Sequence, residues 1–213
     1  YLFHARSHDN KVLLALVNEL VDDNTSEADV VAAAIAASRA DSPHVSQVRV
    51  IDSEPMALVM PELSGHTLRE LLASKKPGLK TACQIGFQTA LGLVAVHATQ
   101  SAHGGVWPEN LWIDAAGTIK LLQYPLVPLA DHVVGEQQPA ANYRAPELFA
   151  GEPASPMTDV YALGCTLFEL IAGHVPFGGA GLAKIRARHE AEVPPRLDRL
   201  RGEVPEELAD LVA

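Results

Sequence analysis

The 213-residue chain is poor in cysteine and in positive charge, and each shortage excludes a class of protein. Two cysteines, Cys83 and Cys165, are too few for a disulfide framework. Both fall in apolar, helix-like segments, so we predict two buried thiols, which fits a reducing cytoplasm. A net charge of −10 argues against nucleic acid or an anionic membrane as a partner, because both require a basic patch.

Long apolar runs are also missing. No stretch approaches the roughly 18 uninterrupted apolar residues of a membrane span. The best candidate, residues 160–173, is short and contains Glu169. No signal peptide is recognisable, and the chain begins at Tyr1 rather than Met, which suggests a fragment of a longer protein. We therefore expect a cytoplasmic location and no membrane contact by this fragment.

Several common site motifs are absent as well. The sequence has no G-x-G-x-x-G, no G-x-S-x-G, and no nucleophile and base at a recognisable spacing. Its nine histidines are scattered without the spacing of metal ligands, so we predict no metal site.

What is present is enough apolar residue, 48% of the chain, to build a core. Alternation and turn residues predict strands first, and helical periodicity dominates later, which is typical of an α+β fold. The predicted strands are 1–5, 12–17, 47–51, 56–60, 111–113 and 119–122. The predicted helices are 27–39, 64–74, 79–99, 159–172, 180–191 and 205–212.

The longest predicted helix, 79–99, carries its apolar residues close to a helical stripe. The stripe consists of residues 79, 82, 83, 87, 90, 91, 94 and 98. This spacing is typical of a helix.

Three segments, in this order, carry a family resemblance. Residues 103–114 read HGGVWPENLWID, residues 143–147 read YRAPE, and residues 159–177 read DVYALGCTLFELIAGHVPF. Together they resemble the C-terminal lobe of a eukaryotic-like Ser/Thr protein kinase of the bacterial type. The resemblance implies a two-lobe fold, with a β-rich N-lobe at 1–60, a hinge at 61–63 and a helical C-lobe at 64–213.

The resemblance also implies where the charged catalytic groups should stand, and this chain lacks them. The kinase loop places an Asp and a Lys where this chain has Gly105 and Trp107. Three further charged positions are replaced. The phosphate-binding Lys is replaced by Ala15 or Val17, depending on the register, its Glu partner by Ala33, and the metal-binding Asp by Gln123. Glu109 resembles a common solvent-facing residue of the family and is not expected to act as a replacement base.

Other family positions are kept or changed without loss of charge. The resemblance implies that the nucleotide cleft is lined by Met60, Glu62, Leu63, Asn110 and Trp112. It implies structural roles for His103, Tyr124, Glu147 and Asp159, the last as a helix-capping Asp that anchors the loop backbone. Trp112 stands where the family has a Leu beneath the adenine ring. Two interpretations stay open: the indole fills the cleft as an adenine mimic, or it packs into the lobe core.

These departures predict a pseudokinase, a protein-interaction or allosteric module whose partners are other signalling proteins. The alternative is an ATP-binding Ser/Thr kinase with residual activity. Because Mg²⁺ prefers carboxylate oxygens, we expect no cofactor, or ATP bound without a productive metal ion.

Overall fold

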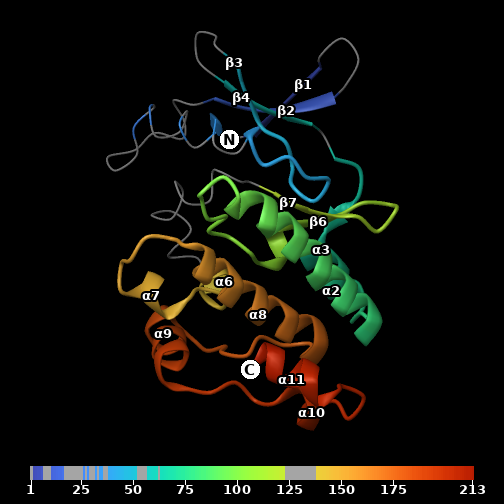
Figure 1. Cartoon of the computed structure of the whole chain (residues 1–213), viewed down its shortest axis with the longest axis vertical. Helices are drawn as coiled ribbons and strands as arrows, with labels where there is room; N and C mark the ends of the chain where they lie inside the picture. Colours follow the sequence, from blue (N-terminus) through green and yellow to red (C-terminus); the bar gives the residue numbers. More distant parts are fainter. Residues whose placement is uncertain are drawn as a thin grey trace.

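The computed structural model describes residues 2–6, 11–16, 26, 28, 32, 34, 35, 38–51, 57–61, 63–122 and 138–213. Within this part of the chain a small β-sheet lobe sits above a larger helical lobe (Figure 1). The architecture is α+β, as the sequence predicts.

The N-lobe sheet is antiparallel, with strand order β1-β2-β4-β3. The strands are β1 (Leu2–Arg6), β2 (Lys11–Leu16), β3 (Arg49–Ile51) and β4 (Ala57–Pro61). The β1–β2 hairpin pairs Leu2 with Ala15, and β2 then pairs with β4, which places Ala15 opposite Leu58. The predicted helix at 27–39 is described only in part, with helical backbone at residues 28, 32, 34, 35 and 38.

The C-lobe contains the helices and a second sheet, with strand order β5-β6-β7. Its strands are β5 (His66–Thr67), β6 (Leu111–Ile113) and β7 (Ile119–Leu121). The helices are α2 (Leu68–Ser74), α3 (Leu79–His97), the 3-10 turn η2 (Pro108–Asn110), α6 (Gln138–Ala141), α7 (Pro146–Phe149), α8 (Pro156–Ala172), α9 (Leu182–Ala191), α10 (Leu197–Leu200) and α11 (Glu206–Val212). The sequence did not predict β5, η2, α6, α7 or α10, and β5 lies within the stretch 64–74 that was predicted to be helical.

Capping side chains fix where two of the helices start. Thr67 and Glu70 form a capping box at the start of α2, as Ser155 and Thr158 do at the start of α8. The prediction that α8 starts at Asp159 was therefore wrong by three residues, and Ser155, not Asp159, is its N-cap. Asp159 lies one turn inside the helix, where its carboxylate is free to bond elsewhere.

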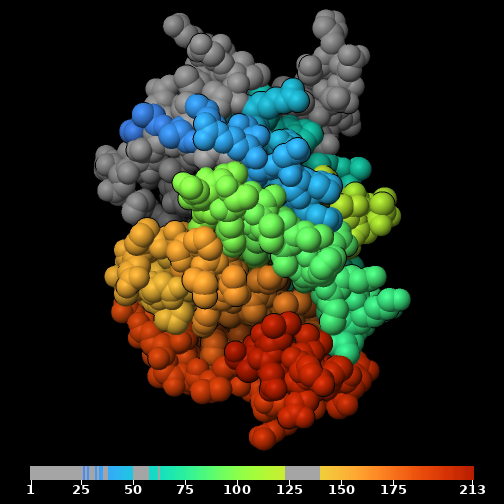
Figure 2. Space-filling view, viewed as in Figure 1, coloured from blue at the N-terminus to red at the C-terminus, as the bar shows by residue number. Residues whose placement is uncertain are grey.

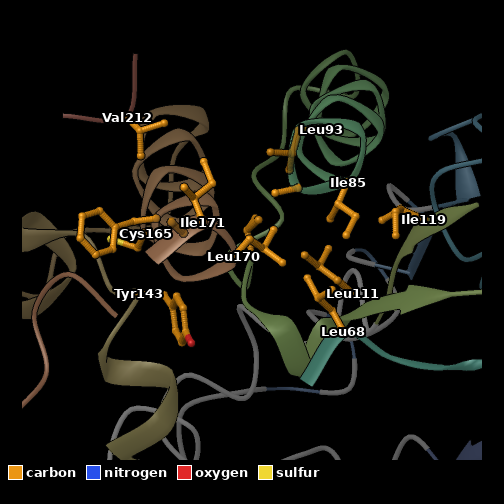
Figure 3. Close-up of a cluster of buried hydrophobic side chains, with 14 of the residues drawn as sticks. Leu68, Ile85, Leu93, Leu111, Ile119, Tyr143, Cys165, Leu170, Ile171 and Val212 are labelled. Atoms are coloured by element: carbon orange, nitrogen blue, oxygen red, sulfur yellow. The ribbon is translucent and has the colours of Figure 1, made fainter. Parts of the chain in front are cut away.

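The C-lobe core forms where α3 and α8 pack against β6 and β7 (Figure 3). Ile85 and Leu93 point inward from α3, and Leu170 comes from α8 to meet Leu111 of β6. Cys165 is buried on α8, as predicted.

The apolar stripe of α3 is largely not its buried side. The buried positions of the helix are 82, 85, 86, 89, 92, 93 and 96, and only residue 82 belongs to the predicted stripe. Cys83, Phe87, Leu91 and Val94 face solvent, so the prediction that Cys83 is buried was also wrong. The packed side includes Gly86 and Gly92, whose small size admits close neighbours that a hydrophobicity pattern does not register.

A loop that leaves the N-lobe helix region lies directly on the C-lobe. Residues 40–48, light blue in Figure 2, lie beside the green surface of α3. Ser46 N–H donates to the Leu121 carbonyl over 2.9 Å, and Leu121 N–H donates to the His44 carbonyl over 2.8 Å. The His44 carbonyl oxygen also lies close to Gly92, only 2.7 Å from the position that a Cβ would take there. The two lobes therefore touch through backbone as well as through the hinge.

Among the described helices, α3 has the length and hydropathy of a membrane span. Its buried side packs against α8 and β7 in the C-lobe core. Length and composition are therefore weak support for a span, because the core helix of a folded domain has the same properties.

Candidate functional site

The loop between α3 and β6 is held by one buried carboxylate. Asp159 accepts hydrogen bonds from His103 N–H at 2.7 Å and from Gly104 N–H at 2.8 Å. It also accepts one from His97 Nε2 at 2.8 Å, at the end of α3. Gly104 has a φ of +77°, which favours glycine, so both amides can reach the same carboxylate. The expected anchoring of the loop by Asp159 is thus present, although Asp159 does not cap its helix.

His103 lies fully buried beneath the loop. Its Nδ1 accepts from Gly105 N–H at 3.2 Å, which leaves Nε2 to donate to the Leu122 carbonyl at 3.0 Å. Burial lowers the pKa of His103, and the nearby Asp159 carboxylate only partly offsets this. A neutral ring that is engaged at both nitrogens serves the structure and is not placed to take a proton from a substrate.

Gly105 stands at the loop position where the resemblance implies the catalytic Asp. It is buried, and its carbonyl accepts from Asn110 Nδ2 at 3.1 Å. Asn110 is also held through its backbone, because its carbonyl accepts from Leu122 N–H at 2.8 Å. The loop is therefore folded around Gly105, whose side chain is a single hydrogen atom and provides no carboxylate.

Trp107 precedes η2 at the position where the resemblance implies a Lys. The indole is half-buried and packs against the C-lobe core, and it lines a small apolar pocket with Ala141 and Tyr143. An apolar packing contact thus occupies the place where the family would have an ammonium group.

A charged network lies next to the loop. Arg69 of α2 donates to Glu109 Oε1 at 2.8 Å and to Glu169 Oε1 of α8 at 2.7 Å. It also donates to the Tyr143 hydroxyl at 2.6 Å, and Tyr143 in turn donates to Glu169. Glu109 is thus an ion-pair partner rather than a purely solvent-facing residue, which corrects the sequence-based expectation.

Burial and hydrogen bonding together shift the pKa values of Arg69 and Tyr143 in this network. Burial by itself lowers the pKa of Arg69, but the hydrogen bonds to Glu169 and Glu109 outweigh it, and the pKa is raised. Burial and the neighbouring Glu169 carboxylate raise the pKa of Tyr143. Arg69 therefore stays cationic and Tyr143 neutral, so the network positions elements and does not exchange protons.

Sequence reasoning missed Arg69, Tyr143 and Glu169 as members of this site. Arg69 and Glu169 lie 100 residues apart, so no local pattern joins them. The sequence signal was limited to charged residues within the helices: Arg69 beside Glu70 in α2, and Glu169 in the mostly apolar α8.

Some of the remaining predicted site residues belong to the part of the chain that the structure describes, and others do not. Met60 is buried at the end of β4, and Leu63 is half-buried in the connection between the lobes. Glu147 lies half-buried in the first turn of α7. Val17, Ala33, Glu62, Gln123 and Tyr124 lie outside the described residues.

Trp112 is half-buried on β6 and does not belong to the core cluster. Its Nε1–H donates to the Ser64 carbonyl at 3.2 Å, just beyond the hinge. The interpretation that the indole packs into the lobe core is therefore contradicted, and the structure places it against the connection between the lobes.

Possible metal ligands near the loop are few among the described residues. Within 63–122 and 138–213 no three His, Cys, Asp or Glu side chains gather as metal ligands. In the loop, the Asn110 amide is engaged with Gly105 and the Glu109 carboxylate with Arg69. Mg²⁺ is held mainly through carboxylates and phosphates. Of the Glu109 carboxylate, Oε1 pairs with Arg69, while Oε2 is buried without a hydrogen-bond partner.

Comparison with known proteins agrees with this geometry. The family model described as "Protein kinase domain" matches residues 4–212. The chain is 32% identical over 191 residues to the serine/threonine-protein kinase PkaB of Streptomyces coelicolor, covering 81% of this chain and 44% of that protein. It is 28% identical over 187 residues to PrkC of Bacillus subtilis, covering 83% and 28%, and 35% identical over 162 residues to PknL of Mycobacterium tuberculosis, covering 73% and 40%.

The chain thus spans less than half the length of these three relatives. The match nevertheless runs through both lobes and through the loop held by Asp159. The chain belongs to the protein kinase family.

Proposed function

We propose that this domain is a pseudokinase, a kinase fold that acts through binding to other signalling proteins rather than through phosphoryl transfer. The observation that carries the proposal is Gly105, which folds into the loop with its carbonyl bonded to Asn110 and presents no carboxylate. Phosphoryl transfer depends on a positioned base, a Lys and metal ions acting together. A general base alone contributes roughly 10²–10⁴-fold.

The rest of the loop supports a retained scaffold. The Asp159 carboxylate accepts hydrogen bonds from His103 N–H and Gly104 N–H, and Arg69 ties α2 to α8. A module that binds partners needs this shape but none of the lost charges. The partner class, other signalling proteins, rests on the family alone, and no described surface names one of them.

A second candidate function is residual Ser/Thr kinase activity with ATP bound. The intact anchoring of the loop favours it, because only charged groups are missing. The two functions differ in one measurable outcome, the transfer of phosphate to an acceptor.

The test uses the full chain, radiolabelled ATP with Mg²⁺ or Mn²⁺, and casein as a generic acceptor. We expect no label above background. The control is the Asn110→Ala variant, purified in the same way. Label that appears with the wild type and disappears with Asn110→Ala would belong to this chain and would overturn the proposal. Label that is equal in both preparations would come from a contaminating kinase.

Nucleotide binding is tested separately by thermal unfolding with ATP, with and without Mg²⁺. A ligand at about 100 times its Kd stabilises a protein by about 2.7 kcal/mol, which raises Tm by several degrees. We expect no Mg²⁺-dependent shift. A shift that requires Mg²⁺ would favour the second candidate function.

A further inference from the structure

A cleft of about 290 Å³ lies between α8, α9 and α11, outside the site described above. Its wall contains the buried side chains of Phe168 from α8, Phe177 from the segment before α9, and Val212 from α11. Val212 lies beside α8 in Figure 3. Mostly apolar clefts of roughly 300–1,000 Å³ are typical of sites for small molecules.

A glycine in the middle of α8 leaves this cleft open. Gly164 lines the cleft, and among the described residues no heavy atom lies within 4 Å of the position that a Cβ would take there. Glycine inside a helix is less favourable than alanine by about 1 kcal/mol, and no close neighbour requires it at this position. The missing side chain therefore leaves space that a larger residue would fill.

The titratable side chains deep in the wall are uncharged at neutral pH. The Tyr161 hydroxyl and His189 Nδ1 are hydrogen-bonded to each other at 2.6 Å. Burial raises the pKa of the Cys165 thiol to about 12 and, with Arg188 nearby, lowers the pKa of His189 to about 4. Glu192 is 49% exposed and pairs with Arg188 at 2.8 Å. A charged ligand would lose its hydration inside this cleft, whereas an uncharged one has little to lose.

Aromatic rings form the inner wall, and apolar side chains stand at the opening. The His189 ring centroid lies 4.8 Å from that of Phe177 and 5.7 Å from that of Tyr161. Rings at such distances attract one another in tilted and offset arrangements, which a further ring can join. At the opening, Val160 is 54% and Leu211 is 76% exposed. Exposed apolar groups that gather at a cleft are typical of a ligand site.

We propose that the cleft between α8, α9 and α11 binds a small, uncharged, aromatic molecule, and that Gly164 keeps it open. Apolar cavities of roughly 150 Å³ bind benzene, so this cleft has room for a molecule of about two rings. The inference goes beyond the proposed function, because it holds whether or not the domain transfers phosphate.

The experiment is a fluorescence titration of the full chain with N-phenyl-1-naphthylamine, an uncharged aromatic dye that brightens in apolar surroundings. We expect saturable binding of one dye molecule per chain. Gly164→Leu fills the cleft, so it should bind the dye at least about tenfold more weakly. Gly78→Leu is the matched control, since it adds the same side chain at an exposed position where a Cβ also meets no heavy atom within 4 Å. It should bind as the wild type does.

A second measurement keeps the result decisive if Gly164→Leu unfolds, which circular dichroism would show. Methyl NMR of the wild type follows the same titration. The methyl signals of Val160 and Val212 should shift, because the rings of the dye lie against them. Val94 is the internal control, since it is 66% exposed on α3 and should not shift.

Three outcomes contradict the proposal. If a folded Gly164→Leu binds the dye as the wild type does, the cleft is not the binding site. If Val94 shifts instead of Val212, the dye lies on the exposed side of α3. If light scattering without dye shows a dimeric wild type and a monomeric Gly164→Leu, the cleft is a contact between two copies of the chain.

Discussion

A single buried carboxylate, that of Asp159, accepts hydrogen bonds from three groups that belong to two segments of the chain. Its side chain is only 1% exposed. Hydrogen bonds to a charged group contribute more to the free energy of unfolding than neutral ones do. A buried amide that loses its partner destabilises the fold by its full desolvation free energy. At the scale of the residue, the loop therefore depends on Asp159, a side chain that lies outside the loop.

We predict that Asp159→Ala lowers the free energy of unfolding by about 3–5 kcal/mol, because it leaves buried donors unpaired. The measurement is urea unfolding followed by circular dichroism. Asp210→Ala is the matched control, since Asp210 pairs with Arg196 at the surface and is 59% exposed. Its loss should cost less than about 1 kcal/mol. Equal losses in the two variants would show that Asp159 does not anchor the loop.

A second prediction concerns His189 of α9, which is buried among the rings of Phe149, Tyr161 and Phe177. Burial, with Arg188 nearby, lowers its pKa to about 4. Below its ordinary pKa of 6.5 the unfolded chain gains a proton that the folded chain does not. Stability therefore falls as the pH drops from 6.5 toward 4, by about 2 kcal/mol at pH 5 from this group.

Urea unfolding at pH 7.5 and pH 5 measures this effect, with His189→Gln as the comparison. The variant keeps hydrogen-bonding groups for Tyr161 but cannot titrate, so its loss of stability between the two pH values should be smaller by that amount. The other titrating groups, the buried His103 included, are common to both proteins and cancel in the difference. A variant with the same pH dependence as the wild type would contradict the prediction.

At the scale of the element, α3 decides how closely the pieces of the C-lobe approach one another. Gly86 and Gly92 lie on its packed side, against Leu167 of α8 and the carbonyl of His44, respectively. A Cβ at position 86 would meet the end of a flexible side chain, whereas one at position 92 would meet backbone. The contact at Gly92 is therefore the less forgiving of the two.

We predict that Gly92→Ala lowers the free energy of unfolding by about 1–3 kcal/mol, because the His44 backbone must move. This occurs although alanine favours a helix over glycine by about 1 kcal/mol. Gly164→Ala on α8 is the matched control, because no heavy atom lies within 4 Å of the new Cβ. It should gain up to about 1 kcal/mol. Thermal unfolding of both variants checks the opposite signs, and a stabilised Gly92→Ala would contradict the close packing.

At the scale of the whole molecule, the two lobes are joined at more than one place. Trp112 of β6 is hydrogen-bonded to Ser64, which directly follows the hinge. The loop at 40–48 is bonded to β7, because Ser46 and His44 both form backbone hydrogen bonds with Leu121. Backbone hydrogen bonds that cross between lobes oppose their separation. We infer that the loop at 40–48 unfolds only together with the C-lobe core.

Hydrogen exchange tests this inference. The amides of Ser46 and Leu121 should exchange with the same opening free energy as the amide of Leu93 in the middle of α3, because one cooperative unit contains all three. Much faster exchange at Ser46 would show that the loop separates from the C-lobe without unfolding it. The Gly92→Ala variant should speed exchange at Ser46 more than at Leu93.

The sequence by itself determined the local features of this protein. Turn residues and alternation predicted the β1–β2 hairpin and the strands β3, β4, β6 and β7 near their observed ends, and helical periodicity predicted α2, α3 and α8. These features depend on neighbours in the chain, so a local pattern contains them. The glycine at position 105 is likewise fixed by sequence, because a side chain that is not encoded cannot be supplied by folding.

Only the tertiary structure decided which side of α3 is buried, that Arg69 joins Glu109 to Glu169, and that Trp112 faces Ser64 rather than the core. The apolar pattern of α3 fits more than one face, and the choice depends on how closely Gly86 and Gly92 let α8 and the loop at 40–48 approach. Each of these hydrogen bonds joins residues that are 40 or more positions apart in the sequence. Whether such residues come into contact is decided by the packing of the whole domain.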